Sequence, residues 1–212
     1  MKWNVPNILT MTRMACTPLV VLMFLLDIPN GIGVFVALGI YIIACITDFL
    51  DGYIARKYNM ITDFGKFMDQ IADKAITTSA MVLVLLATRN VTVIWFAVVI
   101  VLTVILRDTI ISGIRMVAAT KKIVIAADIF GKVKSFFLDV ASMILMVYVG
   151  LTACLDGAEE AKIGAMPIEY VRCFGLALMT VGALLAVISC VNYSIKAVKA
   201  LKEKTEEAKE ND

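Results

Sequence analysis

The chain has 212 residues, of which 61% are hydrophobic and only 18% are charged, and its formal net charge is +2. An average soluble domain is about half apolar, and one core of this size cannot bury the excess of hydrophobic side chains. The composition therefore excludes a disordered chain and a coiled coil, and it predicts a membrane protein rather than a soluble domain.

Six apolar segments follow one another along the chain, each long enough to cross a bilayer as a helix. They cover residues 8–26, 34–55, 64–87, 91–117, 131–151 and 168–195. Arg13 interrupts the first segment, which could begin as a short amphipathic helix on the membrane surface before it bends into the span. The sequence thus predicts an all-α integral membrane protein with six transmembrane helices.

Polar or turn-forming residues separate these segments. The breaks cover residues 27–31, 58–63, 88–90 and 118–130, and a longer acidic loop covers residues 156–167. No soluble domain interrupts this pattern. We expect residues 1–201 to form a single transmembrane domain and residues 202–212 to form a charged cytoplasmic tail.

Lysine and arginine are distributed unevenly across the predicted membrane. One side would hold only Arg89, Lys162 and Arg172, and the other side would hold Lys2, Arg13, Arg56, Lys57, Lys66, Arg115, Lys121, Lys122, Lys132, Lys134 and the tail lysines. The positive-inside rule then places both termini in the cytoplasm, and we expect a bacterial inner or plasma membrane. The basic residues lie at helix ends without interleaved aromatic residues, so we expect no nucleic-acid partner.

Four aspartates lie at the ends of two neighbouring apolar segments, where ionisable residues are rare unless they have a function. Asp48 and Asp51 lie near the end of the second segment, and Asp69 and Asp73 lie near the beginning of the third. Steps of three or four residues place the acids of each segment on one helical face. Because the short link makes the two helices antiparallel neighbours, we expect the four carboxylates to face one another across one cleft.

Four carboxylates in a cleft of low dielectric constant repel one another and need cations. Aspartate oxygens suit Mg²⁺ or Mn²⁺, and two such ions about 3.5–4 Å apart would form a clamp for phosphoryl transfer. Gly52 and Ala55 on the same face would leave room for a bulky ligand, and Arg56 could hold a phosphate. Two alternatives stay open, namely salt bridges of the acids with Arg56, Lys66 and Lys74, or a pathway for divalent cations through the bundle.

The spacing of these residues resembles the signature of the CDP-alcohol phosphatidyltransferases, D-x2-D-G-x2-A-R, then eight residues, then G-x3-D-x3-D. The chain matches every position of it, at Asp48, Asp51, Gly52, Ala55, Arg56, Gly65, Asp69 and Asp73. The resemblance implies six membrane helices, a homodimer, and a site open to the cytoplasm in which the aspartates hold two divalent cations. It also implies that the CDP group is surrounded by Gly52, Ala55, Arg56 and Gly65.

The resemblance further implies the reaction. CDP-diacylglycerol would donate its phosphatidyl group to an alcohol by in-line displacement, with release of CMP and with Asp73 as the general base. The chain contains no histidine that could take this role. Segments 4–13, 107–115 and 131–135 resemble the branch of the family that uses sn-glycerol 3-phosphate and makes phosphatidylglycerophosphate, although the chain departs from it at Gln70, Asp108 and Ser135. The resemblance covers about residues 4–150.

Glycerol 3-phosphate is a dianion, so an acceptor site needs basic residues. Arg107 and Arg115 are eight residues apart and lie near one face of the fourth segment, while Lys132 and Lys134 begin the fifth. Together they predict a basic pocket that faces the acids, with Arg107 the deepest because it lies well inside an apolar run. The lysines could instead be ordinary helix-end residues that follow the positive-inside rule.

Two other functions stay open. Another enzyme of the same family would use inositol phosphate or serine, or would make cardiolipin, and the basic pocket argues only against serine, which has no phosphate. A divalent-cation transporter would need polar residues that continue towards the outer side of the membrane. Beyond the four acids, only Thr77, Thr78 and Ser79 extend in that direction.

Overall fold

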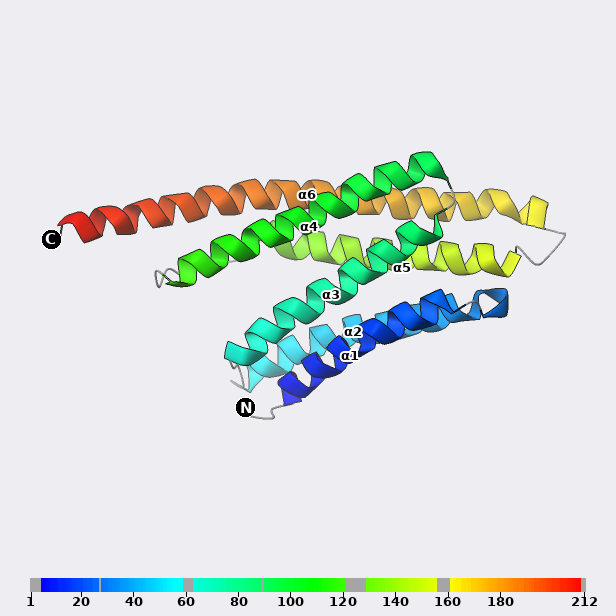
Figure 1. The fold of residues 1–212 in the computed structure, drawn as a ribbon, viewed down its shortest axis with the longest axis horizontal. Coiled ribbons are helices and arrows are strands. Elements are labelled where there is room, and N and C mark those ends of the chain that lie inside the picture. The colour runs from blue at the N-terminus through cyan, green and yellow to red at the C-terminus, as the bar shows by residue number, and fades with distance from the viewer. Residues whose placement is uncertain are drawn as a thin grey trace.

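The computed structural model describes residues 5–26, 28–58, 63–88, 90–120, 129–155 and 161–210 as a bundle of helices (Figure 1). In chain order the elements are α1 Val5–Leu25, the short 3-10 helix η1 Pro29–Gly31, α2 Ile32–Lys57, α3 Asp63–Ala87, α4 Val91–Thr120, α5 Ile129–Leu155 and α6 Ala161–Glu210. The described residues contain no strand, which confirms the predicted all-α fold.

The helices contain six stretches that are long and apolar enough to cross a membrane. These are Ile8–Leu25, Pro29–Leu50, Met68–Ala87, Val91–Ala118, Gly131–Leu155 and Ile168–Ala200. Large hydrophobic side chains along them are exposed, such as Leu106 and Ile110 on α4, and lipid would cover these surfaces. The prediction of an integral membrane protein with six membrane helices is therefore confirmed.

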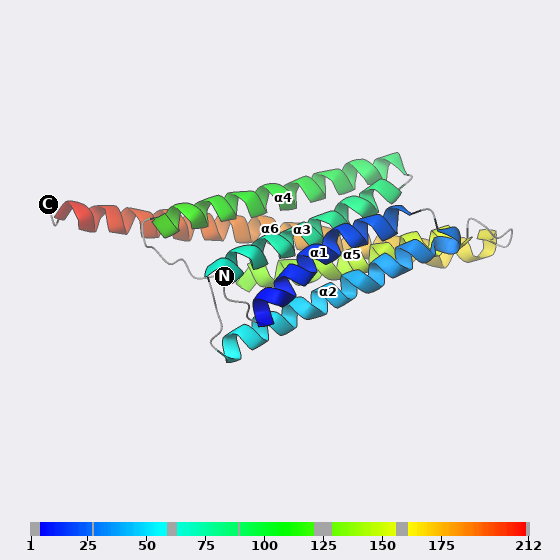
Figure 2. The same ribbon diagram turned by 60° about the horizontal axis from the view of Figure 1, so that its bottom comes forward.

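The helices pack as two groups that meet along α5 and where α3 contacts α4. In one group α1 contacts α2 and α3, in the other α6 contacts α4 and α5, and α5 also contacts α2 and α3. Figures 1 and 2 show both termini at one end of the bundle, which is also the end where α2 passes into α3. Small residues allow the close approach of α5 and α6, because a Cβ on Gly182 would lie 2.9 Å from Leu138 Cδ2.

Two helices differ in length from the sequence-based expectation. α1 is one continuous helix from Val5 through Pro18 to Leu25, so no break separates a surface helix from a span among these residues. α6 begins at Ala161 and runs to Glu210, so it includes much of the expected loop 156–167 and most of the expected tail 202–212. The tail is rich in Lys and Glu, which are strong helix formers, and this explains its extension beyond the bundle.

Candidate functional site

Arg13 joins the two acidic helices. Its guanidinium, which comes from α1 and is 1% exposed, pairs through Nη1 with Asp48 on α2 and, at 3.2 Å, with Asp69 on α3. The two carboxylates are accessible, since the exposed fractions of these side chains are 42% and 48%. The structure thus brings Asp48 and Asp69 together, and it adds a buried cation that the sequence analysis did not assign to the site.

Asp73 connects this acidic region with a neighbouring pocket. It lies one helical turn after Asp69 on the same face of α3. Asp48, Asp69 and the Arg13 guanidinium are within electrostatic range of its carboxylate. The same side chain also lines a pocket between α3, α4 and α5. A group at this position can act on a ligand that spans both regions.

The ligand chemistry of the acidic region fits a divalent cation. Asp48 and Asp69 each direct an Oδ1 atom to Arg13 Nη1, and carboxylate oxygens are the ligands that Mg²⁺ and Mn²⁺ prefer. Among the side chains that the structure describes, no three acids or cysteines lie close enough together to form a metal-binding group. The side chain of Asp51, the fourth predicted ligand, lies outside that set. In this structure Arg13 provides the positive charge between Asp48 and Asp69.

The residues predicted to surround the CDP group lie where α2 ends and α3 begins. Gly52 and Gly65 are both partly exposed, one on each of the two helices. The side chains of Ala55 and Arg56 lie outside the described residues, so their prediction is not tested by the structure.

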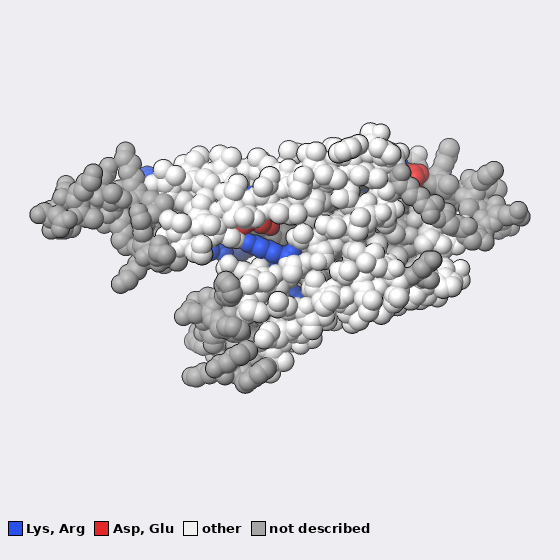
Figure 3. All heavy atoms as spheres, viewed as in Figure 1, with Lys and Arg blue, Asp and Glu red and all other residues white. Residues whose placement is uncertain are grey.

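The pocket beside Asp73 is polar on several walls. We call it the Lys134 pocket, and it is lined by Asp73, Lys74, Thr77, Thr78, Val104, Asp108, Lys134, Ser135 and Leu138. Its empty volume is about 290 Å³ when the space open to solvent is included. Figure 3 shows basic and acidic atoms together in a hollow of a face that is mostly uncharged. The charged and hydroxyl groups on its walls can bind polar groups of a ligand.

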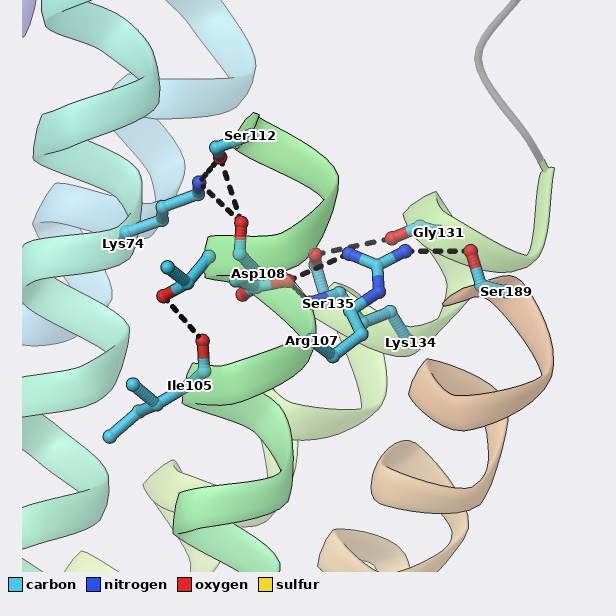
Figure 4. Close-up of polar contacts among 10 residues, drawn as sticks. Lys74, Ile105, Arg107, Asp108, Ser112, Gly131, Lys134, Ser135 and Ser189 are labelled. Carbon is cyan, nitrogen blue, oxygen red and sulfur yellow. Dashed lines mark hydrogen bonds and ion pairs between the residues drawn. The ribbon is translucent and has the colours of Figure 1, made fainter. Parts of the chain in front are cut away.

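Asp108 is the common partner of two cations at the pocket. Its Oδ1 atom accepts hydrogen bonds from Lys134 Nζ at 2.5 Å and from Arg107 Nη1 at 2.7 Å (Figure 4). Arg107 also donates from Nη2 to the Ser189 hydroxyl on α6 at 2.6 Å. A Cβ on Gly131 would lie 3.2 Å from that Nη2, so glycine leaves room for the guanidinium. These contacts fix both cations before any ligand binds.

The four residues predicted to bind the acceptor are placed differently. Lys134 lines the pocket, and Arg107 adjoins it through Asp108. Arg115 and Lys132 are exposed, and the guanidinium of Arg115 lies 6.0 Å from the ring centroid of Tyr193. Both side chains are largely buried, since that of Arg107 is 11% exposed and that of Lys134 is 5% exposed.

Sequence reasoning missed a polar group on α5. The carboxylate of Asp139 accepts hydrogen bonds from the hydroxyl groups of Tyr41 on α2 and Thr77 on α3, each at 2.9 Å. The signal was present, because an aspartate in an apolar helix needs partners. A second missed contact comes from Lys74, which donates to the Asp108 carbonyl oxygen at 3.2 Å and to the Ser112 hydroxyl. Figure 4 shows Lys74 reaching from α3 to α4.

Comparisons with known proteins agree with the resemblance found in the sequence. The family model described as CDP-alcohol phosphatidyltransferase matches residues 3–188, a longer range than the residues 4–150 that the motifs indicated. Among similar proteins, one from Rickettsia bellii is 32% identical over 92% of this chain and 96% of its own length. Others are from Bacillus subtilis, 32% identical over 69% of this chain and 78% of that protein, and from Escherichia coli, 37% identical over 64% and 72%. All three are named CDP-diacylglycerol–glycerol-3-phosphate 3-phosphatidyltransferase.

Proposed function

The chain belongs to the CDP-alcohol phosphatidyltransferase family, and from this premise we propose that it transfers the phosphatidyl group of CDP-diacylglycerol to sn-glycerol 3-phosphate. The products are phosphatidylglycerophosphate and CMP. The names of the similar proteins support this acceptor. The observation that carries the proposal is the position of Asp73, which lies one turn from Asp69 and lines the same pocket as Lys134.

The acidic region is the proposed donor site. Asp48, Asp51, Asp69 and Asp73 would hold two divalent cations, Mg²⁺ or Mn²⁺, whose charge would neutralise the diphosphate of the donor and stabilise the leaving CMP. The CDP group would lie against Gly52, Ala55, Arg56 and Gly65. Glycine adds no side chain at these two positions, and Arg56 would donate hydrogen bonds to a phosphate. Arg13 pairs with Asp48 and Asp69 and would orient their carboxylates.

Asp73 is the proposed general base. An alcohol is a poor nucleophile while it keeps its proton, so a positioned base increases the rate. The carboxylate of Asp73 takes the proton of the 1-hydroxyl as that oxygen bonds to the phosphatidyl phosphorus. The bond from this phosphorus to the CMP oxygen breaks at the same time, and CMP takes the electron pair.

The Lys134 pocket is the proposed acceptor site. Lys134 and Arg107 share Asp108 as an anionic partner, and a phosphate dianion would compete for both cations. Charge-assisted hydrogen bonds from these residues would hold the phosphate while the far hydroxyl lies at Asp73. Arg115 and Lys132, which are exposed on α4 and α5, would increase the local concentration of the dianion by longer-range attraction.

The membrane arrangement follows from the same proposal. The active site would face the cytoplasm of a bacterial inner or plasma membrane, with both termini on that side, because the basic residues concentrate there. The acyl chains of the donor would stay in the bilayer while its headgroup enters between α2 and α3. Exposed apolar side chains along the helices would contact lipid and a second copy of the chain, and we propose a homodimer.

A CMP-release assay tests this function. The purified protein in detergent micelles would receive CDP-diacylglycerol, Mg²⁺ or Mn²⁺, and one alcohol at a time from glycerol 3-phosphate, glycerol, inositol phosphate, serine and phosphatidylglycerol. We expect rapid CMP release only with glycerol 3-phosphate, together with phosphatidylglycerophosphate as the lipid product. Faster release with inositol phosphate or another alcohol would overturn the assignment of the acceptor.

A further inference from the structure

Asp139 fixes the direction of one hydroxyl group at the edge of the Lys134 pocket. A single oxygen atom, Oδ1, accepts from Tyr41 Oη and from Thr77 Oγ1, each at 2.9 Å. Tyr41 is fully buried, and Asp139 is not among the residues that line the pocket. Thr77 does line it. Thr77 is therefore the member of this group that a ligand in the pocket can reach.

Thr77 differs from most threonines in the described helices. Thr12, Thr103, Thr109 and Thr180 donate their hydroxyl hydrogen to the carbonyl oxygen four residues earlier, which is a common local bond. Thr77 instead donates across to α5. The sequence thus uses a partly buried acid on another helix to orient a hydroxyl group that would otherwise bond within its own helix.

The orientation has a definite chemical consequence. A threonine hydroxyl has one hydrogen and two lone pairs, and the hydrogen of Thr77 is committed to Asp139. This holds whether Asp139 is ionised or carries a proton on its other oxygen, because Oδ1 is an acceptor in both forms. Towards the pocket, Thr77 can only accept a hydrogen bond, so its partner there must be a donor.

The neighbours of Thr77 indicate which donor this is. Asp73 lies one turn away on the same helix, and Lys134 lines the pocket from α5. In glycerol 3-phosphate a middle hydroxyl separates the reacting hydroxyl from the phosphate. We propose that Thr77, oriented by Asp139, binds the 2-hydroxyl of the acceptor and selects acceptors that carry it. This inference rests on the proposed function.

A site can distinguish the two enantiomers of an acceptor when it contacts three different groups of that acceptor. With the reacting hydroxyl at Asp73 and the phosphate at Lys134, the side on which the 2-hydroxyl lies differs between the two enantiomers of glycerol phosphate. Thr77 is then a specificity-determining residue, since it contributes to recognition of sn-glycerol 3-phosphate over its enantiomer.

The test compares two acceptors that differ only in this hydroxyl. The kcat/KM of CMP release would be measured with sn-glycerol 3-phosphate and with 3-hydroxypropyl phosphate, which lacks the 2-hydroxyl. We expect the unmodified enzyme to prefer sn-glycerol 3-phosphate by about 2- to 10-fold, as one neutral hydrogen bond allows. Thr77→Val should remove most of this preference by lowering kcat/KM for sn-glycerol 3-phosphate alone. Thr77→Ser, which retains the hydroxyl, should keep the preference.

Matched variants separate this role from a structural one. Thr78→Val changes the neighbouring threonine of the same pocket and should leave the ratio between the two acceptors unchanged. If Thr77→Val lowers kcat/KM equally for both acceptors, Thr77 has a structural role and the inference is overturned. The inference is also overturned if Thr78→Val removes the preference between the acceptors and Thr77→Val does not. Equal use of the two acceptors by the unmodified enzyme would overturn it without any variant. Absence of CMP release with sn-glycerol 3-phosphate in the unmodified enzyme would instead overturn the proposed function, and this inference with it.

Discussion

The acidic region and the Lys134 pocket have opposite charge patterns. In the acidic region two accessible carboxylates, Asp48 and Asp69, share one buried cation, Arg13. In the pocket two largely buried cations, Lys134 and Arg107, share one carboxylate, Asp108. Each region thus contains one internal counter-ion. Arg13 in the acidic region is positive, like the divalent cation that we propose to bind there. Asp108 in the pocket is negative, like the proposed phosphate ligand.

This comparison indicates how the protein keeps both regions stable without ligands. Like charges in a membrane-embedded site repel one another, and an internal counter-ion offsets this repulsion. The same counter-ion then competes with the ligand for the charged groups of the site. A divalent cation would compete with Arg13, and a phosphate dianion would compete with Asp108. Asp73 belongs to both regions. Substitutions in the acidic region and substitutions in the Lys134 pocket should therefore affect the reaction in different ways.

Removal of divalent cations should have the largest effect, because it removes the ligand of the acidic region entirely. We expect excess EDTA to abolish CMP release and excess Mg²⁺ or Mn²⁺ to restore it. The measurement is the initial rate before chelation, after chelation and after the metal is returned. Unchanged CMP release in excess EDTA would contradict the assignment of the acidic region to metal binding.

Replacement of Asp73 should have the next largest effect. Asp73→Asn has nearly the same shape but does not accept the proton, so we expect kcat to fall about 10²- to 10⁴-fold. Binding of a water-soluble CDP-alcohol in Mg²⁺, measured by calorimetry, should change much less. Near-normal turnover by Asp73→Asn would show that another group is the base.

Arg13 should matter for stability more than for the chemistry. In Arg13→Gln the carboxylates of Asp48 and Asp69 lose their buried counter-ion, so the metal-free protein should melt several degrees lower. Mg²⁺ should raise the melting temperature of the variant by more than it raises that of the unmodified protein. Equal shifts by Mg²⁺ in both proteins, measured by thermal unfolding in detergent, would argue against competition between Arg13 and the cation.

The exposed basic residues should have the smallest effect. Arg115→Ala and Lys132→Ala remove charges that lie outside the pocket, so we expect kcat/KM for glycerol 3-phosphate to fall by less than about fivefold. The loss should shrink at high salt, because long-range attraction between exposed charges is screened. A large, salt-independent loss in either variant would show direct contact with the acceptor.

The sequence was sufficient to predict the helices and the meeting of Asp48 with Asp69, because hydropathy and a spacing of three or four residues are local properties. The six membrane helices follow from apolar length alone, and the acids follow from helical periodicity. The course of α1 was less predictable, since a charge at position 13 suggests an interruption unless its partners on other helices are known. Arg13 is accommodated because Asp48 and Asp69 come to it from α2 and α3.

Contacts between distant helices could not be predicted from the sequence. Arg107 lies deeper in its apolar segment than Lys134 does, yet Lys134 is the more buried side chain, because burial depends on which neighbours pack against it. The bond between Thr77 and Asp139 joins residues 62 positions apart, and no spacing rule connects them. Asp139 was nevertheless recognisable as an acid in an apolar run, and that signal was overlooked.

The kinetics of Lys134→Ala test the account most directly, because this residue defines the pocket that Asp73 shares. Charge-assisted hydrogen bonds are worth roughly 1.5–3 kcal/mol, so we expect the KM for glycerol 3-phosphate to rise about ten- to hundredfold. The KM for CDP-diacylglycerol should change by less than about twofold, and the exposed neighbour variant Lys132→Ala should show neither large change. If the KM for CDP-diacylglycerol rises as much as the KM for glycerol 3-phosphate, the Lys134 pocket is not the acceptor site and the account is wrong.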